Sequence, residues 1–308
     1  NFDEFYGGMK GAPKFPSSLP IRFLLRYYQR SGDRSFLDMA TLTLEKMAAG
    51  GINDQLGGGF HRYSVDPEWL VPHFEKMLYD NALLSIAYLE GYQASGREDF
   101  AQTVRHTLDY IAREMTSPEG GFYSATDADS KNPQDHYEEG WFFTWTPEEL
   151  DQLLNQQQAQ LIKTFYGVTD NGNFEGRTIF NRTLSKAETA KQLQLSTEQL
   201  QQLLTQSHEL LYQHRSGRPK TLLDDKILTA WNGLMISAFA SAGFVLNEPR
   251  YIEQAQHAAD FILTNLYKEG RLRRSYKDGQ ARHNAYLDDY ANFITALLDL
   301  NEATAEPR

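Results

Sequence analysis

The chain has 308 residues, a net charge of −11 and 41% hydrophobic residues, enough for one large domain or two ordinary ones. Its longest basic run is the short "RLRR" at 271–274, which argues against a nucleic-acid or anionic-membrane partner. The absence of cysteine excludes disulfides, thiolate nucleophiles and cysteine-based zinc sites. No apolar run approaches the roughly 20 residues of a membrane span, and no signal peptide is visible, so we expect a cytoplasmic protein.

Hydrophobic periodicity predicts helices of two kinds that alternate along the chain. In chain order they cover residues 19–31, 35–49, 77–95, 97–117, 146–155, 196–215, 228–246, 249–268 and 288–305. The second, fourth and eighth carry one apolar stripe, whereas the third, seventh and ninth are apolar on nearly every side and rich in small residues. The first and fifth are assigned to the buried kind and the sixth to the striped kind. Within the ambiguous segment 146–215, "TDNGNFEGRTIFN" reads as a turn or short hairpin.

This alternation predicts an internal repeat of helical hairpins in one domain over residues 1–308. The simplest closed form is a toroid with the buried helices as an inner ring and the striped helices outside. An open solenoid is the competing form, although its two kinds of helix would differ less in burial. Nine helices make four and a half hairpins, so the last inner helix has no outer partner.

Long loops rich in glycine and aromatic residues lead back to each inner helix, and we expect them to meet at one face of the ring. Helix N-termini at this face carry partial positive charge and unpaired N–H groups. The loops and first turns bring many acidic and aromatic side chains to that face: His73, Glu75, Asp80, Asp127, Asp129, Glu138, Glu139, Trp141, Asp224, Asp225, Trp231, Asp288 and Asp289.

Carboxylates beside aromatic rings, without a basic patch, point to a neutral polyhydroxylated ligand, that is, a sugar. A glycosidase needs two carboxylates on opposite sides of the sugar, and an epimerase needs a base beside one carbon. We predict Glu75 and Asp80 as catalytic residues on one wall, with Asp225 and Asp289 opposite. His73, together with His61 or His283, is the candidate base of an epimerase. The remaining predicted substrate-binding residues are His61, Tyr79, Asp127, Glu139, Trp141, Asp224, Trp231, Asn232 and Asp288.

Structural roles are the main alternative for these residues. Asp80, Asp225 and Asp288 lie at or just before helix starts, where capping alone favours an acid. The segment "DADSKNPQDHYE" imitates a calcium loop, but Lys131 and Asn132 occupy positions that need a ligand and a glycine. We therefore predict no metal and no cofactor. A non-catalytic ligand-binding or docking scaffold is the alternative function.

Six segments resemble the large domain of the YyaL family: "GGMKGAPKFP", "DQLGGGFHRYSVDPEWLVPHFEKMLYDNALL", "GGFYSATDADS" with "EEGWFFTWTPEEL", "DDKILTAWNGLMISA" and "AYLDDYANFITALLDL". These are thioredoxin-domain-containing proteins with a DUF255 signature, similar to spermatogenesis-associated protein 20. The resemblance covers essentially the whole chain and implies an all-α, six-hairpin (α/α)6 toroid, the architecture of several glycosidases and of N-acylglucosamine 2-epimerases.

The resemblance also implies that the chain is a fragment with about nine of twelve helices. A thioredoxin-like domain would precede it in the full-length protein and would be the partner of a docking scaffold. A homodimer formed through the truncated flank is a further expectation. The sugar-related activity is an analogy at the level of the fold.

Overall fold

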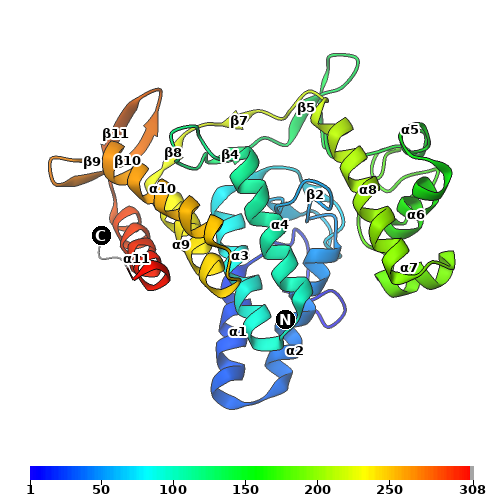
Figure 1. Cartoon of the computed structure of the whole chain (residues 1–308), viewed down its shortest axis with the longest axis horizontal. Helices are drawn as coiled ribbons and strands as arrows, with labels where there is room; N and C mark the ends of the chain where they lie inside the picture. The colour runs from blue at the N-terminus through cyan, green and yellow to red at the C-terminus, as the bar shows by residue number, and fades with distance from the viewer. Residues whose placement is uncertain (306–308) are drawn as a thin grey trace.

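The structure is a computed structural model that describes residues 1–305. Helices dominate these residues, and short strands occur only in the long connections (Figure 1). The helices are α1 (Ser18–Ser31), α2 (Arg34–Ala49), α3 (Leu78–Ser95), α4 (Glu98–Glu114), α5 (Pro147–Leu153), α6 (Gln156–Tyr166), α7 (Lys186–Leu193), α8 (Thr197–Ser216), α9 (Thr229–Val245), α10 (Pro249–Asn265) and α11 (Leu287–Thr304). None of the helices in this part of the chain is long and apolar enough to cross a membrane.

Seven of the helices form the ring-like part of the molecule. The pairs α1/α2, α3/α4 and α9/α10 are antiparallel hairpins, and α11 follows them (Figure 1). The first helix of each hairpin packs against the first helix of the next, so α1, α3, α9 and α11 form a continuous inner layer. The second helices, α2, α4 and α10, lie on the outside. The alternation of inner and outer helices expected from the sequence is therefore present.

The apolar stripes predicted for the outer helices face the core. Every stripe residue is buried, because each outer helix leans on its inner partner through one side only. These residues are Leu37, Ala40, Leu44 and Met47 in α2; Phe100, Val104, Leu108 and Ile111 in α4, with Met115 just after it; and Tyr251, Ala255, Ala259 and Ile262 in α10, followed by Leu266.

The inner helices α3 and α9 are buried on most sides, and small residues let their neighbours approach closely. Gly233 in α9 gives the clearest case. A Cβ atom at this position would lie 2.6 Å from the backbone carbonyl carbon of Asn292 in α11. Only a residue without a side chain fits this crossing of two helix backbones.

The two end helices of the inner layer, α1 and α11, differ from this pattern because each is covered on one side only. Leu19 and Phe23 of α1 are 74% and 62% exposed. Leu287 and Leu298 of α11 are 84% and 61% exposed. Within residues 1–305 no helix packs on these faces.

Residues 146–215 depart from the predicted ring. The segment predicted as inner helix 146–155 contains the short helix α5, and the segment predicted as outer helix 196–215 is α8. Both pack with α6 and α7 around a separate apolar core of their own, which we call the lobe (Figure 1, right). Consequently α3 and α9 are direct neighbours in the inner layer. Description of 1–308 as a single domain stays a prediction.

Short strands join the long loops to one another. Four groups are formed: β1 (Tyr63–Ser64) with β2 (Pro72–His73); β3 (Lys76–Met77) with β4 (Ala125–Thr126) and β7 (Leu223–Asp224); β5 (Asp129–Lys131) with β6 (Tyr137–Glu139); and β8 (Ile227–Leu228) with β10 (Arg271–Lys277), β11 (Gln280–Asn284) and β9 (Tyr267–Lys268). All pairs are antiparallel. The segment predicted as a turn or short hairpin closes with a bridge between Phe174 and Arg177.

Candidate functional site

The three-stranded sheet β3–β4–β7 brings together loops that are distant in sequence. Met77, Ala125 and Asp224 are aligned across it, and so are Lys76, Thr126 and Leu223. Since β3 leads directly into α3, and β7 is followed closely by β8 and α9, the sheet lies at the N-terminal ends of two inner helices (Figure 1). Neighbouring side chains of a strand point to opposite faces, so this small sheet has two different surfaces.

Two buried asparagines hold the loops at these helix ends in the same way. The side-chain oxygen of Asn81 accepts from the backbone N–H of Phe60 at 2.7 Å, and its amide donates back to the Phe60 carbonyl at 3.1 Å. Asn232 makes the same pair of bonds to Phe122, at 2.8 and 2.9 Å. Asn232 was predicted as a substrate-binding residue. It is fully buried and clamps a loop instead, so we correct that assignment.

A half-buried histidine with two carboxylate neighbours forms the first wall of the site. His73 Nδ1 lies 2.7 Å from Glu139 Oε1, and its Nε2 lies 3.1 Å from Glu75 Oε2. Glu75 also accepts from Arg62 at 2.7 Å, and the ring of Tyr63 stacks on the imidazole with 5.2 Å between centroids. Glu139 comes from β6, in the connection between α4 and the lobe, so this wall joins two loops that are distant in sequence.

Asp80 lies in the first turn of α3, beside this wall. Burial raises the pKa of its carboxyl to about 7, although the nearby Arg62 and a hydrogen bond from Tyr79 act in the opposite direction. No side-chain hydrogen bond caps α3, so the capping role that we considered for Asp80 is not found. The Tyr79 ring meets the edge of Trp231 from the first turn of α9, with centroids 4.8 Å apart. An acid protonated near neutral pH thus lies beside an aromatic pair.

The remaining predicted carboxylates lie around the edge of the same sheet. Asp224 and Asp225 are partly exposed and pair with Lys226 at 3.1 Å and Lys277 at 2.6 Å, respectively. Asp127 accepts from the backbone N–H of Ala128 at 2.7 Å. In residues 1–305, no group of three histidines or carboxylates has the arrangement of a metal site.

Carboxylates also crowd the β5–β6 hairpin near the first wall. Burial and the neighbouring charges of Asp127 and Glu139 raise the pKa of Asp129, while His73 opposes the shift. Glu138 accepts from the side chain of Asn132 at 3.0 Å. Asp127, Asp129 and Glu139 therefore lie near His73.

Asp289 was predicted as a catalytic residue, and the structure gives it a structural role instead. Its side chain is fully buried at the start of α11. It accepts from the backbone N–H groups of Tyr286 at 2.9 Å and Ala230 at 3.0 Å, and from Arg274 at 3.1 Å. These bonds cap α11 and join it to the start of α9, which leaves no carboxylate surface for a ligand.

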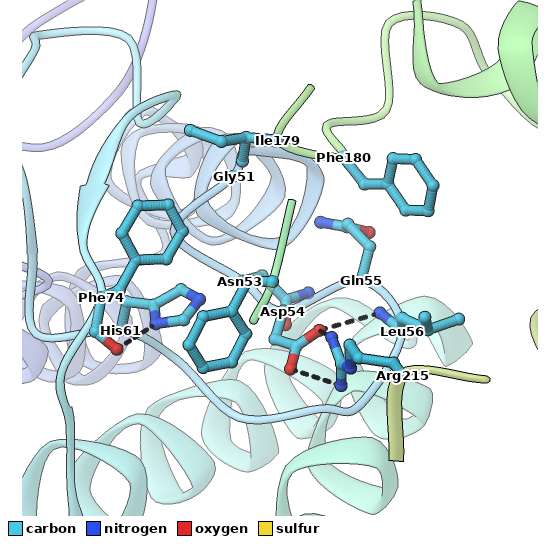
Figure 2. Close-up of a pocket in the computed structure, with 11 residues that line it drawn as sticks. Gly51, Asn53, Asp54, Gln55, Leu56, His61, Phe74, Ile179, Phe180 and Arg215 are labelled. Atoms are coloured by element: carbon cyan, nitrogen blue, oxygen red, sulfur yellow. Dashed lines mark hydrogen bonds and ion pairs between the residues drawn. The ribbon is translucent and has the colours of Figure 1, made fainter. Parts of the chain in front are cut away.

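His61 and Trp141 were predicted to bind substrate, but both belong to the interior. His61 is 1% exposed and its Nδ1 lies 2.9 Å from the carbonyl oxygen of Phe74 (Figure 2). Burial lowers the pKa of its imidazole to about 3, so it is neutral. Trp141 is 9% exposed, with the guanidinium groups of Arg177 and Arg218 over its ring.

The other two predicted residues of the C-terminal part lie on the surface. Asp288 is exposed and 3.5 Å from Arg274, whereas His283 is exposed in β11. Neither has the partial burial that distinguishes Asp80 and His73. The predicted residues with the geometry of a binding site are therefore those at the starts of α3 and α9.

Sequence reasoning missed a buried ionic cluster where the lobe meets the ring. Asp54 makes two bonds to Arg215 of α8, at 2.8 and 3.0 Å (Figure 2), and a third to Lys76 at 2.8 Å. Lys76 also donates to the carbonyl of Gly58 at 2.7 Å and lies over the ring of Tyr110. Burial lowers the pKa of Lys76, and the Asp54 carboxylate opposes this shift.

The alternating inner and outer hairpins make this an all-α protein of the (α/α)6 toroid class, with a six-hairpin, glycosidase-like fold, as the sequence predicted. A solved alpha-1,6-mannanase, GH76A of Salegentibacter sp. HEL1_6, superimposes with a TM-score of 0.53. The match has 13% sequence identity and covers 96% of this chain and 59% of that chain. At this identity the likeness defines the fold alone.

Curated relatives match nearly the whole chain. Human spermatogenesis-associated protein 20 is 39% identical over 340 residues, which cover 99% of this chain and 43% of that protein. An uncharacterized protein of Caenorhabditis elegans is 34% identical over 333 residues, covering 97% of this chain and 45% of that protein. No protein-family model matches.

The chain is thus related to spermatogenesis-associated protein 20, and it spans less than half of the length of these relatives. This relationship agrees with the resemblance drawn from the sequence motifs. The YyaL and DUF255 labels, and the presence of a thioredoxin-like domain in the full-length protein, stay predictions.

Proposed function

We propose that the starts of α3 and α9, with the wall formed by His73, Glu75 and Glu139, form a carbohydrate-binding cleft of a sugar-active enzyme. The observation that carries the proposal is Asp80, a carboxyl whose pKa is raised to about 7 beside the Tyr79–Trp231 pair. A protonated acid at neutral pH is the group that donates a proton to a leaving oxygen.

Glu75 is the proposed second carboxylate. It shares Arg62 with Asp80: Arg62 donates to Glu75 at 2.7 Å, and its charge acts on the Asp80 carboxyl. Two carboxyl groups in different electrostatic environments are the arrangement used in glycoside hydrolysis, where one is the acid and the other is the base or nucleophile. The aromatic pair supplies apolar faces on which a sugar ring can stack.

The fold adds support of a more general kind. The superimposed mannanase was solved in complex with alpha-1,6-mannotetrose, as a variant inactivated at two consecutive aspartates. In this chain, Asp224–Asp225 is a partly exposed pair of consecutive aspartates, whereas the other such pair includes the buried Asp289. We therefore include Asp224 and Asp225 in the proposed cleft, opposite Asp80.

A sugar epimerase is the second candidate, favoured by the contact between His73 and Glu139. The Glu139 carboxylate at Nδ1 fixes the imidazole, and Nε2 together with its neighbour Glu75, 3.1 Å away, is the proposed proton-transfer pair beside a sugar carbon. The two reactions differ in their products, since hydrolysis releases a new reducing end and epimerisation changes only the configuration at one carbon.

The test begins with a thermal-shift screen of the 308-residue chain against monosaccharides and short oligosaccharides, alpha-1,6-mannotriose included, because a bound ligand raises the melting temperature. Ligands that bind are then followed by NMR for release of reducing ends or for epimerisation. We expect D80N and E75Q to lower turnover by at least about 100-fold, and D38N, at an exposed position of α2, to leave it unchanged.

Failure of every saccharide to shift the melting temperature would reject this function. A shift with a separate thioredoxin-like domain in the same screen would then favour the docking scaffold. A cytoplasmic location of the full-length protein is likewise proposed, and fractionation of cells tests it.

A further inference from the structure

The segment "KGAPKFP", which precedes α1, brings an aromatic ring to the histidine wall of the proposed cleft. The ring of Phe15 lies 5.0 Å from the ring of Tyr63, measured between centroids, with the two planes 36° apart. Tyr63 in turn stacks on His73 at 5.2 Å. Phe15 is 54% exposed and Tyr63 is partly exposed, so the two rings present an aromatic surface to solvent beside His73.

Single exposed apolar residues are common on protein surfaces, but the backbone at Phe15 is held by a buried anchor. The preceding Lys14 is 3% exposed, and its Nζ donates to Asp3 at 2.8 Å and to the carbonyl oxygen of Pro67 at 2.9 Å. The backbone N–H groups of Lys14 and Ser64 each donate to the carbonyl oxygen of the other residue, at 2.8 and 2.9 Å. A ring fixed in this way beside β1 loses little conformational freedom when a ligand covers it.

A row of contacts continues from His73 to the aromatic pair already assigned to the cleft. His73 lies 3.1 Å from Glu75, and Glu75 accepts from Arg62 at 2.7 Å. Arg62 also interacts with the hydroxyl group of Tyr79, whose ring contacts Trp231. In the order of these contacts, the Glu75 carboxylate therefore lies between two aromatic pairs.

This arrangement fits a chain of sugars better than a single sugar. Hydrolysis of a glycosidic bond needs carboxyl groups beside that bond, which has a sugar on at least one side and a second sugar on the other when the substrate is an oligosaccharide. Each aromatic pair supplies an apolar face for one sugar ring. Stacking at a distance from the reacting carbon adds binding energy that helps to position the bond to be cleaved.

We infer that Phe15 and Tyr63 form a second surface on which a sugar ring stacks, and that the ligand of the cleft is an oligosaccharide, not a monosaccharide. This inference rests on the proposed function and adds a substrate class to it. Phe15 is then a residue that determines the length of the bound saccharide. Its removal should weaken the binding of long ligands and spare the binding of a single sugar.

Isothermal titration calorimetry of the 308-residue chain compares mannose with alpha-1,6-mannotriose and glucose with cellotriose, and any further sugar that the saccharide screen finds is treated in the same way. We expect a trisaccharide to bind at least about ten-fold more tightly than its monosaccharide. F15A should raise the dissociation constant of that trisaccharide about ten-fold and leave that of the monosaccharide unchanged. F15Y keeps an aromatic ring and should retain the affinity, whereas F15L should not. F244A, at a 66% exposed phenylalanine near the C-terminal end of α9, is the matched control.

Two results would overturn the inference and leave the proposed function standing. The first is a trisaccharide that binds F15A as tightly as it binds the wild type. The second is a monosaccharide that binds as tightly as its trisaccharide, or that loses as much affinity in F15A. Absence of binding by every saccharide would reject the proposed function itself, and the inference with it. The melting temperature of each variant without ligand verifies that it is folded.

Discussion

Replacement of Asp80 by asparagine should stabilise the protein, and only above mildly acidic pH. The asparagine side chain has nearly the same shape as aspartate and carries no charge. The folded-state pKa of Asp80 is raised to about 7, above its ordinary value of 3.8. Below pH 3.8 the carboxyl is protonated in both the folded and the unfolded chain, so it does not change the free energy of unfolding. As pH rises from about 4 to about 7, the unfolded chain releases the proton more readily, so the wild type loses stability relative to D80N.

The size of the effect follows from the two pKa values. Their difference corresponds to at most about 4 kcal/mol of unfolding free energy, since one unit is about 1.4 kcal/mol. Asp80 is only partly buried, and solvent screening reduces the effect, so we expect about 2 kcal/mol at pH 8. For a chain of this size that is a rise in melting temperature of roughly 3–5 °C.

Differential scanning calorimetry at pH 4.5 and pH 8 tests this expectation, with D38N as the matched control. The stability difference between D80N and the wild type should be small at pH 4.5, about a quarter of its value at pH 8, because pH 4.5 lies just above the ordinary pKa of 3.8, whereas D38N should follow the wild type at both pH values. A gap of the same size at both pH values, or a less stable D80N at pH 8, would refute the assignment of a raised pKa to Asp80. Loss of turnover together with gained stability would fit a catalytic acid.

Three further substitutions test the scaffold. R215M leaves Asp54 buried with fewer donors and should lower the unfolding free energy by about 3–5 kcal/mol, measured by urea denaturation. N81A and N232A each remove an equivalent loop clamp and should cost similar amounts, about 1–3 kcal/mol; a difference of more than about 2 kcal/mol between them would contradict that equivalence. G233A places a methyl group against the α11 backbone and should lower the melting temperature, with a loss of about 1–3 kcal/mol.

The helices of the ring could be predicted from the sequence because the spacing of apolar residues along each helix indicates which side is buried. The stripe in 97–117 places an apolar residue on one side at every turn, and each of these side chains is buried. The segments of the lobe were wrongly placed in the ring because two of its helices lack such a period. "QQQAQLIKTFY" at 156–166 and "KAETAKQL" at 186–193 are too polar and too short to give a clear period, yet both are helices in a second core.

The candidate site could be predicted only in part. Acids and aromatics near helix starts led to Asp80 and Trp231, which do meet through Tyr79. The same reasoning led us to predict Asp289 as catalytic, because an acid that caps a helix and an acid that serves in catalysis can both lie in the first turn of a helix. The bond between Asp54 and Arg215 joins residues 161 positions apart, and no local pattern could have indicated it.

The strands β4 and β7, which lead to and from the lobe, pair with each other. Thr126, at the end of β4, and Leu223, at the start of β7, are paired residues of one antiparallel ladder. The chain therefore leaves the two clamped hairpins and returns to them at adjacent points. The ladder itself therefore does not depend on the length of this excursion, and a two-residue turn in its place would leave the ladder closed. Such a turn would, however, remove Arg215 and Glu139, which contact Asp54 and His73 in the ring.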